Sequence, residues 1–133
     1  MGFPSSAGPS GPPARPLVLF VDDDANILRA FRRVLRPMAE VWEMRFVEGG
    51  HAALMALAAE PVGAVVTDLH MPGVDGVAVL RAARDASPLA YRLLLTGDVH
   101  EGAGAQAEGL AHGVLAKPCD PELLKGALVQ GLG

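Results

Sequence analysis

Side chains with the chemistry to bind a metal ion and a phosphoryl group stand at the ends of four apolar stretches of this sequence. Asp22 and Asp23 follow one stretch, Asp68 and Lys117 each follow another, and Thr96 closes the remaining one. Carboxylate oxygens are ligands that hard divalent cations such as Mg²⁺ prefer, and an ammonium group and a hydroxyl can both donate hydrogen bonds to phosphoryl oxygens. If the fold gathers these residues, they form an electrostatic site for a metal ion and a phosphoryl group.

Three consecutive acids, Asp22, Asp23 and Asp24, make the first of these positions unusual. A free Asp has a pKa of about 3.9, so all three are expected to be charged at neutral pH. Two such charges about 4 Å apart repel by roughly 4 kcal/mol at an effective dielectric of about 20. One explanation is a cation that offsets this repulsion. The other is that the acids charge the start of a helix, where negative groups are favourable. Asp24 is predicted to be the helix N-cap.

Short apolar runs alternate with helical patterns from Leu17 onward. Continuous apolar runs are typical of strands buried on both faces, and apolar residues three or four apart are typical of helices. Strands are predicted at 17–21, 44–48, 63–67, 91–96 and 113–116, and helices at 27–35, 52–59, 77–83 and 121–128, with Gly49-Gly50 closing the second strand. This alternation predicts an α/β fold whose parallel sheet is covered on both faces. In such folds functional residues gather at the carboxyl ends of the strands.

The composition fits one globular domain. The chain has 133 residues, 50% of them hydrophobic, and a net charge of −4. No basic tract is longer than Arg32-Arg33, which argues against a nucleic-acid surface. No apolar stretch approaches the ~20 residues of a membrane-spanning helix, and Cys119, the only cysteine, cannot form an internal disulfide. The cytoplasm is the expected location. Residues 1–16, rich in Pro, Gly and Ser, are expected to be a disordered tail.

Four motifs occur in order along the chain: "VDDD" (21–24), "TDLHMPGVDG" (67–76), "LLLTG" (93–97) and "LAKPCDPELL" (115–124). Together they resemble the response-regulator receiver domain of bacterial two-component signalling, over about residues 17–130, so the domain is expected to span residues 17–133. The resemblance implies a flavodoxin-like (βα)5 fold, a doubly wound five-stranded parallel sheet with strand order 2-1-3-4-5. It also implies a cis peptide bond between Lys117 and Pro118.

The resemblance assigns a role to each matching residue. Asp68 would be the phosphoacceptor, a carboxylate nucleophile that forms an aspartyl phosphate. Thr96 would hydrogen-bond one phosphoryl oxygen, and Lys117 would pair with another. A histidine kinase or a phosphotransfer protein would supply the phosphoryl group, and an output domain or partner would respond. The domain would thus be a switch and not a turnover enzyme, with no direct nucleic-acid or membrane contact.

The resemblance also implies Mg²⁺ as the cofactor. Asp22, Asp23, Asp68 and the backbone carbonyl of His70 would be its protein ligands. The ion would explain why the crowded acids are tolerated.

The chain departs from the family pattern near its output face. Val114 stands where the family usually has an aromatic residue whose rotamer change reports phosphorylation. His70 and Asp98 would flank the phosphoryl group and tune its hydrolysis, or they are ordinary loop residues. Three glycines in the stretch 100–109 would each cost about 1 kcal/mol in a helix, so a fourth helix there is expected to be short or mobile. Family members often form homodimers through that helix together with the fifth strand and the last helix, which leaves a homodimer open here.

Two other functions fit parts of the pattern. The chain could be a pseudo-receiver that binds partners without phosphorylation, which Val114 and the glycines favour and the complete set of acids, Thr96 and Lys117 opposes. A phosphatase that uses an aspartyl phosphate would typically carry a second acid two residues after the nucleophile, where this chain has His70.

Overall fold

The computed structural model describes residues 15–97, 107 and 109–133. Most of the predicted tail, Asp98 and most of the stretch 100–109 lie outside the described residues. None of the described helices is long and apolar enough to cross a membrane. The elements are, in chain order, β1 (Leu17–Asp22), α1 (Ala25–Leu35), the 3₁₀ helix η2 (Arg36–Glu40), β2 (Glu43–Glu48), α2 (Gly50–Ala59), β3 (Ala64–Asp68), α3 (Gly76–Ala86), β4 (Tyr91–Thr96), β5 (Gly113–Ala116) and α5 (Pro121–Leu132).

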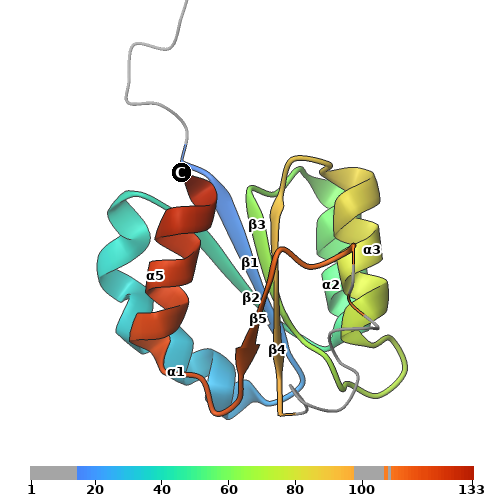
Figure 1. Cartoon of the computed structure of the whole chain (residues 1–133), viewed down its shortest axis with the longest axis horizontal. Coiled ribbons are helices and arrows are strands. Elements are labelled where there is room, and N and C mark those ends of the chain that lie inside the picture. The colour runs from blue at the N-terminus through green and yellow to red at the C-terminus, as the bar shows by residue number, and fades with distance from the viewer. Residues whose placement is uncertain (1–14, 98–106, 108) are drawn as a thin grey trace, which may run out of the picture.

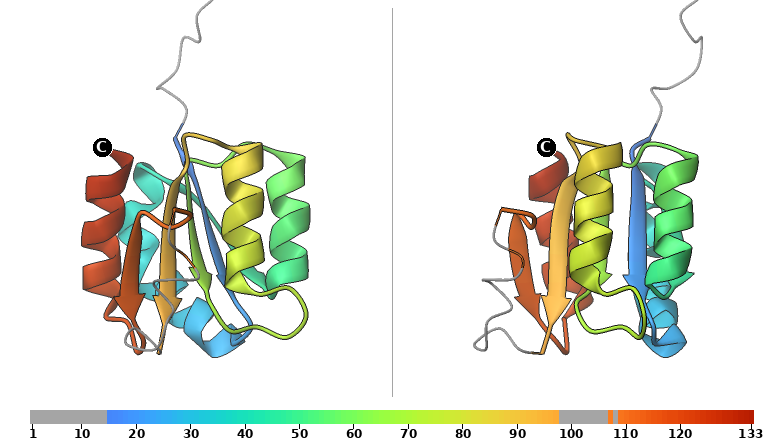
Figure 2. Two further views of the ribbon diagram at one scale, coloured as in Figure 1. Left: turned by 45° about the vertical axis from the view of Figure 1, so that its right-hand side comes forward. Right: turned by 90° about the vertical axis from the view of Figure 1, so that its right-hand side faces the viewer.

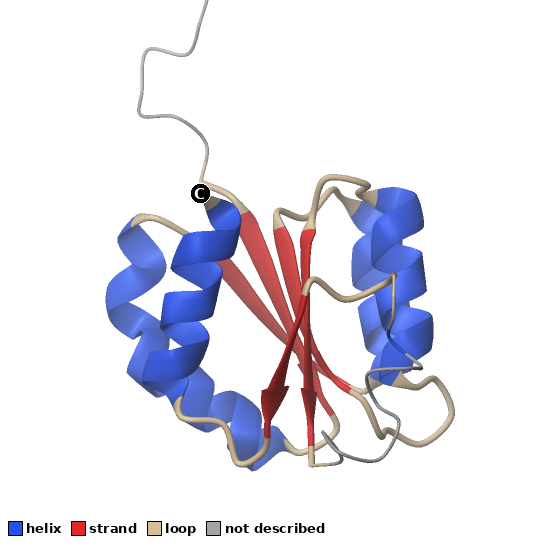
Figure 3. Cartoon of the chain, viewed as in Figure 1, coloured by secondary structure: helices blue, strands red, loops and turns tan. Residues whose placement is uncertain are grey.

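The strands form one parallel sheet in the order β2-β1-β3-β4-β5, which confirms the predicted flavodoxin-like arrangement. Helices α1 and α5 cover one face of the sheet, and α2 and α3 cover the other (Figures 1 and 3). Helices α2 and α3 lie side by side (Figure 2). Strands β1 and β3 are buried along their whole length, as their continuous apolar runs predict.

Successive strand residues point to opposite faces of the sheet and therefore pack into two separate hydrophobic cores. In β4, Leu94 packs into the core beneath α2 and α3, while Leu93 packs into the core beneath α1 and α5. The second core contains Phe20, whose ring stacks on that of Phe46 with centroids 4.7 Å apart. The two cores hold the strands in register, so that their carboxyl ends form one edge.

The helix α1 starts where the capping prediction places it. The Asp24 side chain accepts a hydrogen bond from the Asn26 backbone amide at 2.8 Å, which confirms Asp24 as the N-cap. The prediction for Gly49-Gly50 is only half right. Gly49 follows the strand with a positive φ of 89°, which glycine adopts readily, but Gly50 is already the first residue of α2. A Cβ at Gly50 would lie 2.2 Å from the Val74 carbonyl oxygen, so glycine lets α2 pack against the β3–α3 loop.

Strand β4 carries a buried arginine that the sequence analysis did not single out. Arg92 is 7% exposed, its Nε donates to the Leu110 carbonyl at 2.5 Å, and its backbone amide donates to His112 Nδ1 at 2.9 Å. Burial, aided by the charge of Arg84, lowers the pKa of Arg92. Burial, aided by the charge of Arg92, lowers the pKa of His112, which favours the neutral imidazole that this hydrogen bond requires. These contacts fasten the start of β5 to β4.

Candidate functional site

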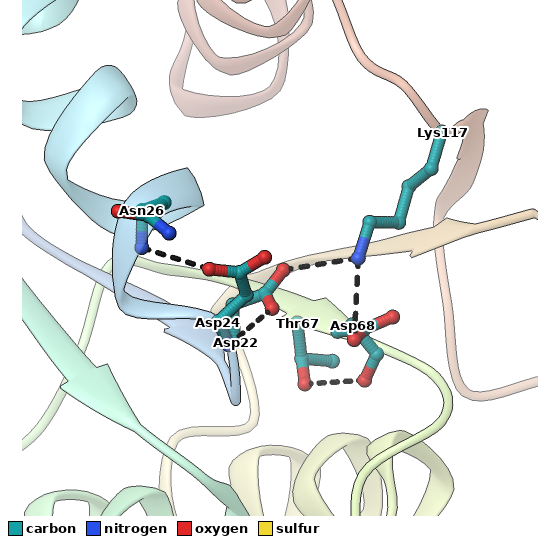
Figure 4. Close-up of polar contacts among 6 residues, drawn as sticks. All are labelled: Asp22, Asp24, Asn26, Thr67, Asp68 and Lys117. Carbon is teal, nitrogen blue, oxygen red and sulfur yellow. Dashed lines mark hydrogen bonds and ion pairs between the residues drawn. The ribbon is translucent and has the colours of Figure 1, made fainter.

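The carboxyl ends of the strands bring together the side chains that the sequence singles out. Asp22, Asp68 and Thr96 are the last residues of β1, β3 and β4, and Lys117 directly follows β5. Because parallel strands share a direction, these ends meet at one edge of the sheet. Asp22, Asp68 and Thr96 are buried there, with 1%, 6% and 0% exposure. Figure 4 shows Asp22, Asp68 and Lys117 converging from three segments of the chain.

Asp22, Asp23 and Asp68 form a carboxylate cluster. One oxygen from each lies within 4.8 Å of the others, and Asp23 is exposed while the other two are buried. The backbone amide of Asp24 donates to Asp22 Oδ1 at 2.9 Å and so orients that carboxylate. Oxygen-only donors with a high negative charge suit Mg²⁺, a hard cation that is usually held by one or two carboxylates and shares its ligands with phosphate. The residues present therefore fit this ion.

Lys117 supplies a positive charge beside the acids. Its Nζ lies 3.2 Å from Asp22 Oδ2 and 3.3 Å from Asp68 Oδ2. Burial raises the pKa of Asp22 above its usual value, and the charge of Asp68 adds to this, although the Asp24 amide and Lys117 act in the opposite direction. Burial alone would lower the pKa of Lys117, but the carboxylates of Asp22 and Asp68 outweigh burial and raise it. The ammonium group therefore stays charged at neutral pH and bridges two acids.

The backbone positions Lys117 relative to the neighbouring strand. Its amide donates to the Thr96 carbonyl at 2.9 Å, directly beyond the ladder that pairs β4 with β5. The peptide bond between Lys117 and Pro118 is cis, as the resemblance predicts.

The other predicted site residues are placed less centrally. His70 is exposed, two residues beyond Asp68 in the loop that leads to α3. Val114 lies within the edge strand β5, in register with Leu94 and 38% exposed. Asp98 lies outside the described residues.

Sequence reasoning did not identify Gly76, which lets the β3–α3 loop pack closely against the backbone of Asp68. Its amide donates to the Leu69 carbonyl at 2.8 Å. A Cβ added at Gly76 would lie 2.3 Å from the Asp68 carbonyl oxygen. The sequence does carry a signal for this role. Asp75 is a typical N-cap residue, and its side chain accepts a hydrogen bond from the Ala78 amide at 3.0 Å, yet the helix then begins with glycine, a poor helix former. Glycine is therefore needed at position 76 because the backbone of Asp68 lies too close for a Cβ atom.

Replacing Gly76 by Ala is expected to destabilise the protein by about 1–3 kcal/mol, because the new Cβ must displace the backbone at Asp68. The matched control is Gly126→Ala in the interior of α5, where a Cβ would meet no atom within 4 Å. That control should be stabilised by about 0.5–1 kcal/mol, since alanine is the better helix former. Urea unfolding of both variants measures the difference. Equal effects in the two variants would contradict the close approach.

The model of the response regulator receiver domain family matches residues 18–129 of this chain. Among curated proteins, the chain is 29% identical over 129 residues to the protein-glutamate methylesterase/protein-glutamine glutaminase of group 2 operon from Rhodospirillum centenum, covering 95% of this chain and 33% of that protein. It is 33% identical over 107 residues to the C4-dicarboxylate transport transcriptional regulatory protein DctD from Rhizobium meliloti, covering 79% of this chain and 23% of that protein.

A solved structure shows the same likeness over a single domain. The signal receiver domain of an HD domain-containing protein from Pseudomonas fluorescens has 34% sequence identity and a TM-score of 0.80, covering 90% of this chain and 95% of that one. The chain therefore spans a third or less of the two curated relatives but nearly all of the isolated receiver domain. With the family match, the sheet order and the acidic edge of the sheet in agreement, the chain belongs to the response-regulator receiver domain family.

Proposed function

We propose that this receiver domain is a phosphorylation switch in which Asp68 accepts a phosphoryl group. The observation that carries the proposal is the position of the Lys117 ammonium, 3.3 Å from the Asp68 carboxylate and beside the acids Asp22 and Asp23. A buried carboxylate with a fixed cation next to it is suited to bind and orient a phosphoryl group.

In the proposed reaction an oxygen of Asp68 forms a bond to phosphorus while the bond from phosphorus to the donor breaks. For a phosphohistidine donor the leaving atom is an imidazole nitrogen, which keeps the bonding electron pair. The Lys117 ammonium then pairs with one oxygen of the transferred group, and the Thr96 hydroxyl donates to another. The protein contributes position and charge neutralisation, and the product is a mixed anhydride on Asp68.

The residues that would hold Mg²⁺ are Asp22, Asp23 and Asp68, with the backbone carbonyl of His70 as a further ligand. When bound, the ion would neutralise charge on the phosphoryl oxygens. The protein's own part is to present three carboxylate oxygens within 4.8 Å of one another. His70 and Asp98 are proposed to flank the phosphoryl group and to affect how fast water removes it.

The proposed phosphoryl donor is a histidine kinase or a phosphotransfer protein in the cytoplasm. The relatives named above join a receiver to different outputs, among them a methylesterase, a transcriptional regulator and an HD domain-containing protein. The output of this chain is therefore proposed only as a partner or attached domain that distinguishes the phosphorylated state. Because Val114 has no aromatic ring, we propose that this response does not depend on a ring rotation at that position.

The test is the intact mass of the protein after incubation with a small acyl phosphate, with and without Mg²⁺. The expected result is a gain of one phosphoryl group that requires Mg²⁺ and maps to the peptide containing Asp68. The absence of any gain, with both the acyl phosphate and a panel of purified histidine kinases, would contradict the proposal and favour a pseudo-receiver that binds partners without phosphorylation.

A further inference from the structure

Four arginines line two adjoining hollows between α1 and β2, which together we call the arginine groove. The hollows have volumes of about 450 and 280 Å³, and Arg32 and Phe46 line both of them. Arg29 and Arg32 are three residues apart on α1, and Arg36, four residues further, directly follows the helix as the first residue of η2 and keeps helical dihedral angles, so the spacing places all three on one side. Arg15 joins them from the segment before β1. Residues of β2 line both hollows. This strand is the last one at one end of the described sheet (Figure 1).

These four arginines form no ion pair with any carboxylate in the described part of the chain. The Arg32 guanidinium lies 4.8 Å from the centre of the Phe46 ring. The hydrogen bonds made by Arg15 and Arg29 go to uncharged oxygens, those of the Ala39 carbonyl and the Asn26 side chain. Of the other cations in the described part of the chain, Arg45, Arg84, Lys117 and Lys125 pair with carboxylates, whereas Arg33, Arg81 and Arg92 do not. The groove therefore holds positive charge that the described structure leaves uncompensated.

The groove also has apolar walls. Leu28 and Phe46 contribute to one hollow, and Trp42, Met44 and Phe46 contribute to the other. The acids that line the groove are Glu43 and Glu48. Glu43 is already paired with Arg45 at 3.2 Å. A chain with a net charge of −4 thus carries one surface where four exposed arginines lie beside an apolar floor, of which Met44 and Phe46 are partly exposed and Leu28 and Trp42 are buried.

We propose that the arginine groove binds an acidic segment of a partner protein, one that carries Asp or Glu side chains and at least one apolar side chain. Guanidinium groups bind carboxylates in a bidentate manner, and the apolar floor gives the segment a site to bury a side chain. Among the described residues no strand pairs with the outer edge of β2, so the segment can lie extended along it. Helix α1, about 16 Å long, would span about five extended residues. This inference does not depend on phosphorylation of Asp68.

Two other occupants fit the groove less well. The chain's own residues 1–14 contain no Asp or Glu, so that segment offers no carboxylate side chain to the arginines. A nucleic-acid duplex keeps its bases stacked in its interior and would make no use of the apolar floor, and its phosphates would approach the acids at 22–24, which directly precede α1. A short acidic and apolar peptide meets neither difficulty.

The test compares two double variants that change the net charge equally. Arg29→Gln with Arg32→Gln alters the groove, and Arg81→Gln with Arg84→Gln removes two exposed arginines at the same spacing on α3. The probe is a short fluorescein-labelled peptide of Glu and Asp with one Leu and one Phe, followed by fluorescence anisotropy. Parallel samples contain the Gln and Asn version of the peptide, an oligonucleotide duplex, or vesicles of phosphatidylserine. Circular dichroism shows whether each variant is folded. If the double variant of Arg29 and Arg32 is unfolded, the single variant Arg36→Gln replaces it in the comparison.

We expect the acidic peptide to bind the wild type and the α3 variant alike, and to bind the groove variant at least about tenfold more weakly, a loss of about 1.4 kcal/mol. The uncharged peptide should not bind. Equal weakening in both variants would show a general charge effect and overturn the proposal. Binding of the duplex or the vesicles that depends on Arg29 and Arg32, without binding of the peptide, would assign the groove to a different ligand and would also overturn it, as would no binding of any probe.

Discussion

Replacing Asp68 by Asn is expected to abolish the Mg²⁺-dependent gain of a phosphoryl group while leaving the protein folded. An amide oxygen is a poor nucleophile and the product could not form at this position, so the loss should be complete. The structure gives a reason why folding survives. Asp68 lies with two other carboxylates within 4.8 Å, and the change removes one of three repelling charges. The Asn oxygen can still accept a hydrogen bond from Lys117 Nζ, which lies 3.3 Å from Asp68 Oδ2.

The matched control is Asp85→Asn on the exposed side of α3, where the carboxylate pairs with Arg84 at 3.2 Å. Intact mass measures phosphorylation in both variants, and thermal unfolding without Mg²⁺ measures stability. We expect the control to be phosphorylated like the wild type, and Asp68→Asn to have an unchanged or higher unfolding midpoint. If the Asp68→Asn variant were phosphorylated to the wild-type level, the phosphoacceptor would have to be a residue other than Asp68.

The edge of the sheet that carries the site could be predicted because each site residue directly follows an apolar run. The strands, read from these runs, differ from the observed ones by no more than one residue at either end. In a parallel sheet, this alone places Asp22, Asp68 and Thr96 at one edge. The order of the strands did not follow from the runs; it came from the family resemblance, and the pairing of β1 with both β2 and β3 confirms it.

What the sequence could not provide depends on distances between distant segments. Lys117 bridges Asp22 and Asp68 across two strands, and only the folded structure shows that one ammonium reaches both acids. The close approach of Gly76 to the Asp68 backbone is likewise visible only in the folded structure. The arginine groove was missed for a different reason. Counting consecutive basic residues finds only Arg32-Arg33, whereas a helix places residues three and four apart on one side.

Replacing Lys117 by Met is expected to slow phosphorylation about 10²–10³-fold, the usual effect of removing one group that stabilises charge in a transition state. Methionine keeps much of the side-chain volume but removes the ammonium that lies 3.2 Å from Asp22 and 3.3 Å from Asp68. The acids that remain would still bind Mg²⁺, so the residual reaction should still require the ion. The control is Lys125→Met, which removes an exposed lysine that pairs with Glu122 at 3.7 Å and should have little effect.

The same variant has a predicted pH dependence. Lys117 lowers the pKa of Asp22, which burial and Asp68 raise, so its removal raises that pKa further. A carboxyl whose pKa is higher in the folded than in the unfolded protein stabilises the fold when protonated, and this stability is lost as the pH rises through the folded value. In the wild type the paired lysine, with its raised pKa, keeps its contribution up to its ordinary value of 10.5.

The unfolding midpoint of Lys117→Met should therefore fall further below that of the wild type as the pH rises from about 4 to about 7. Thermal unfolding in Mg²⁺-free buffer at several pH values measures this difference, and Lys125→Met should show no such trend. A midpoint difference that stays constant with pH would mean that the ion pairs of Lys117 do not control the charge of Asp22. In that case the slow phosphorylation of the variant would reflect loss of contact with the phosphoryl group alone, and not a change in the acids that are proposed to bind Mg²⁺.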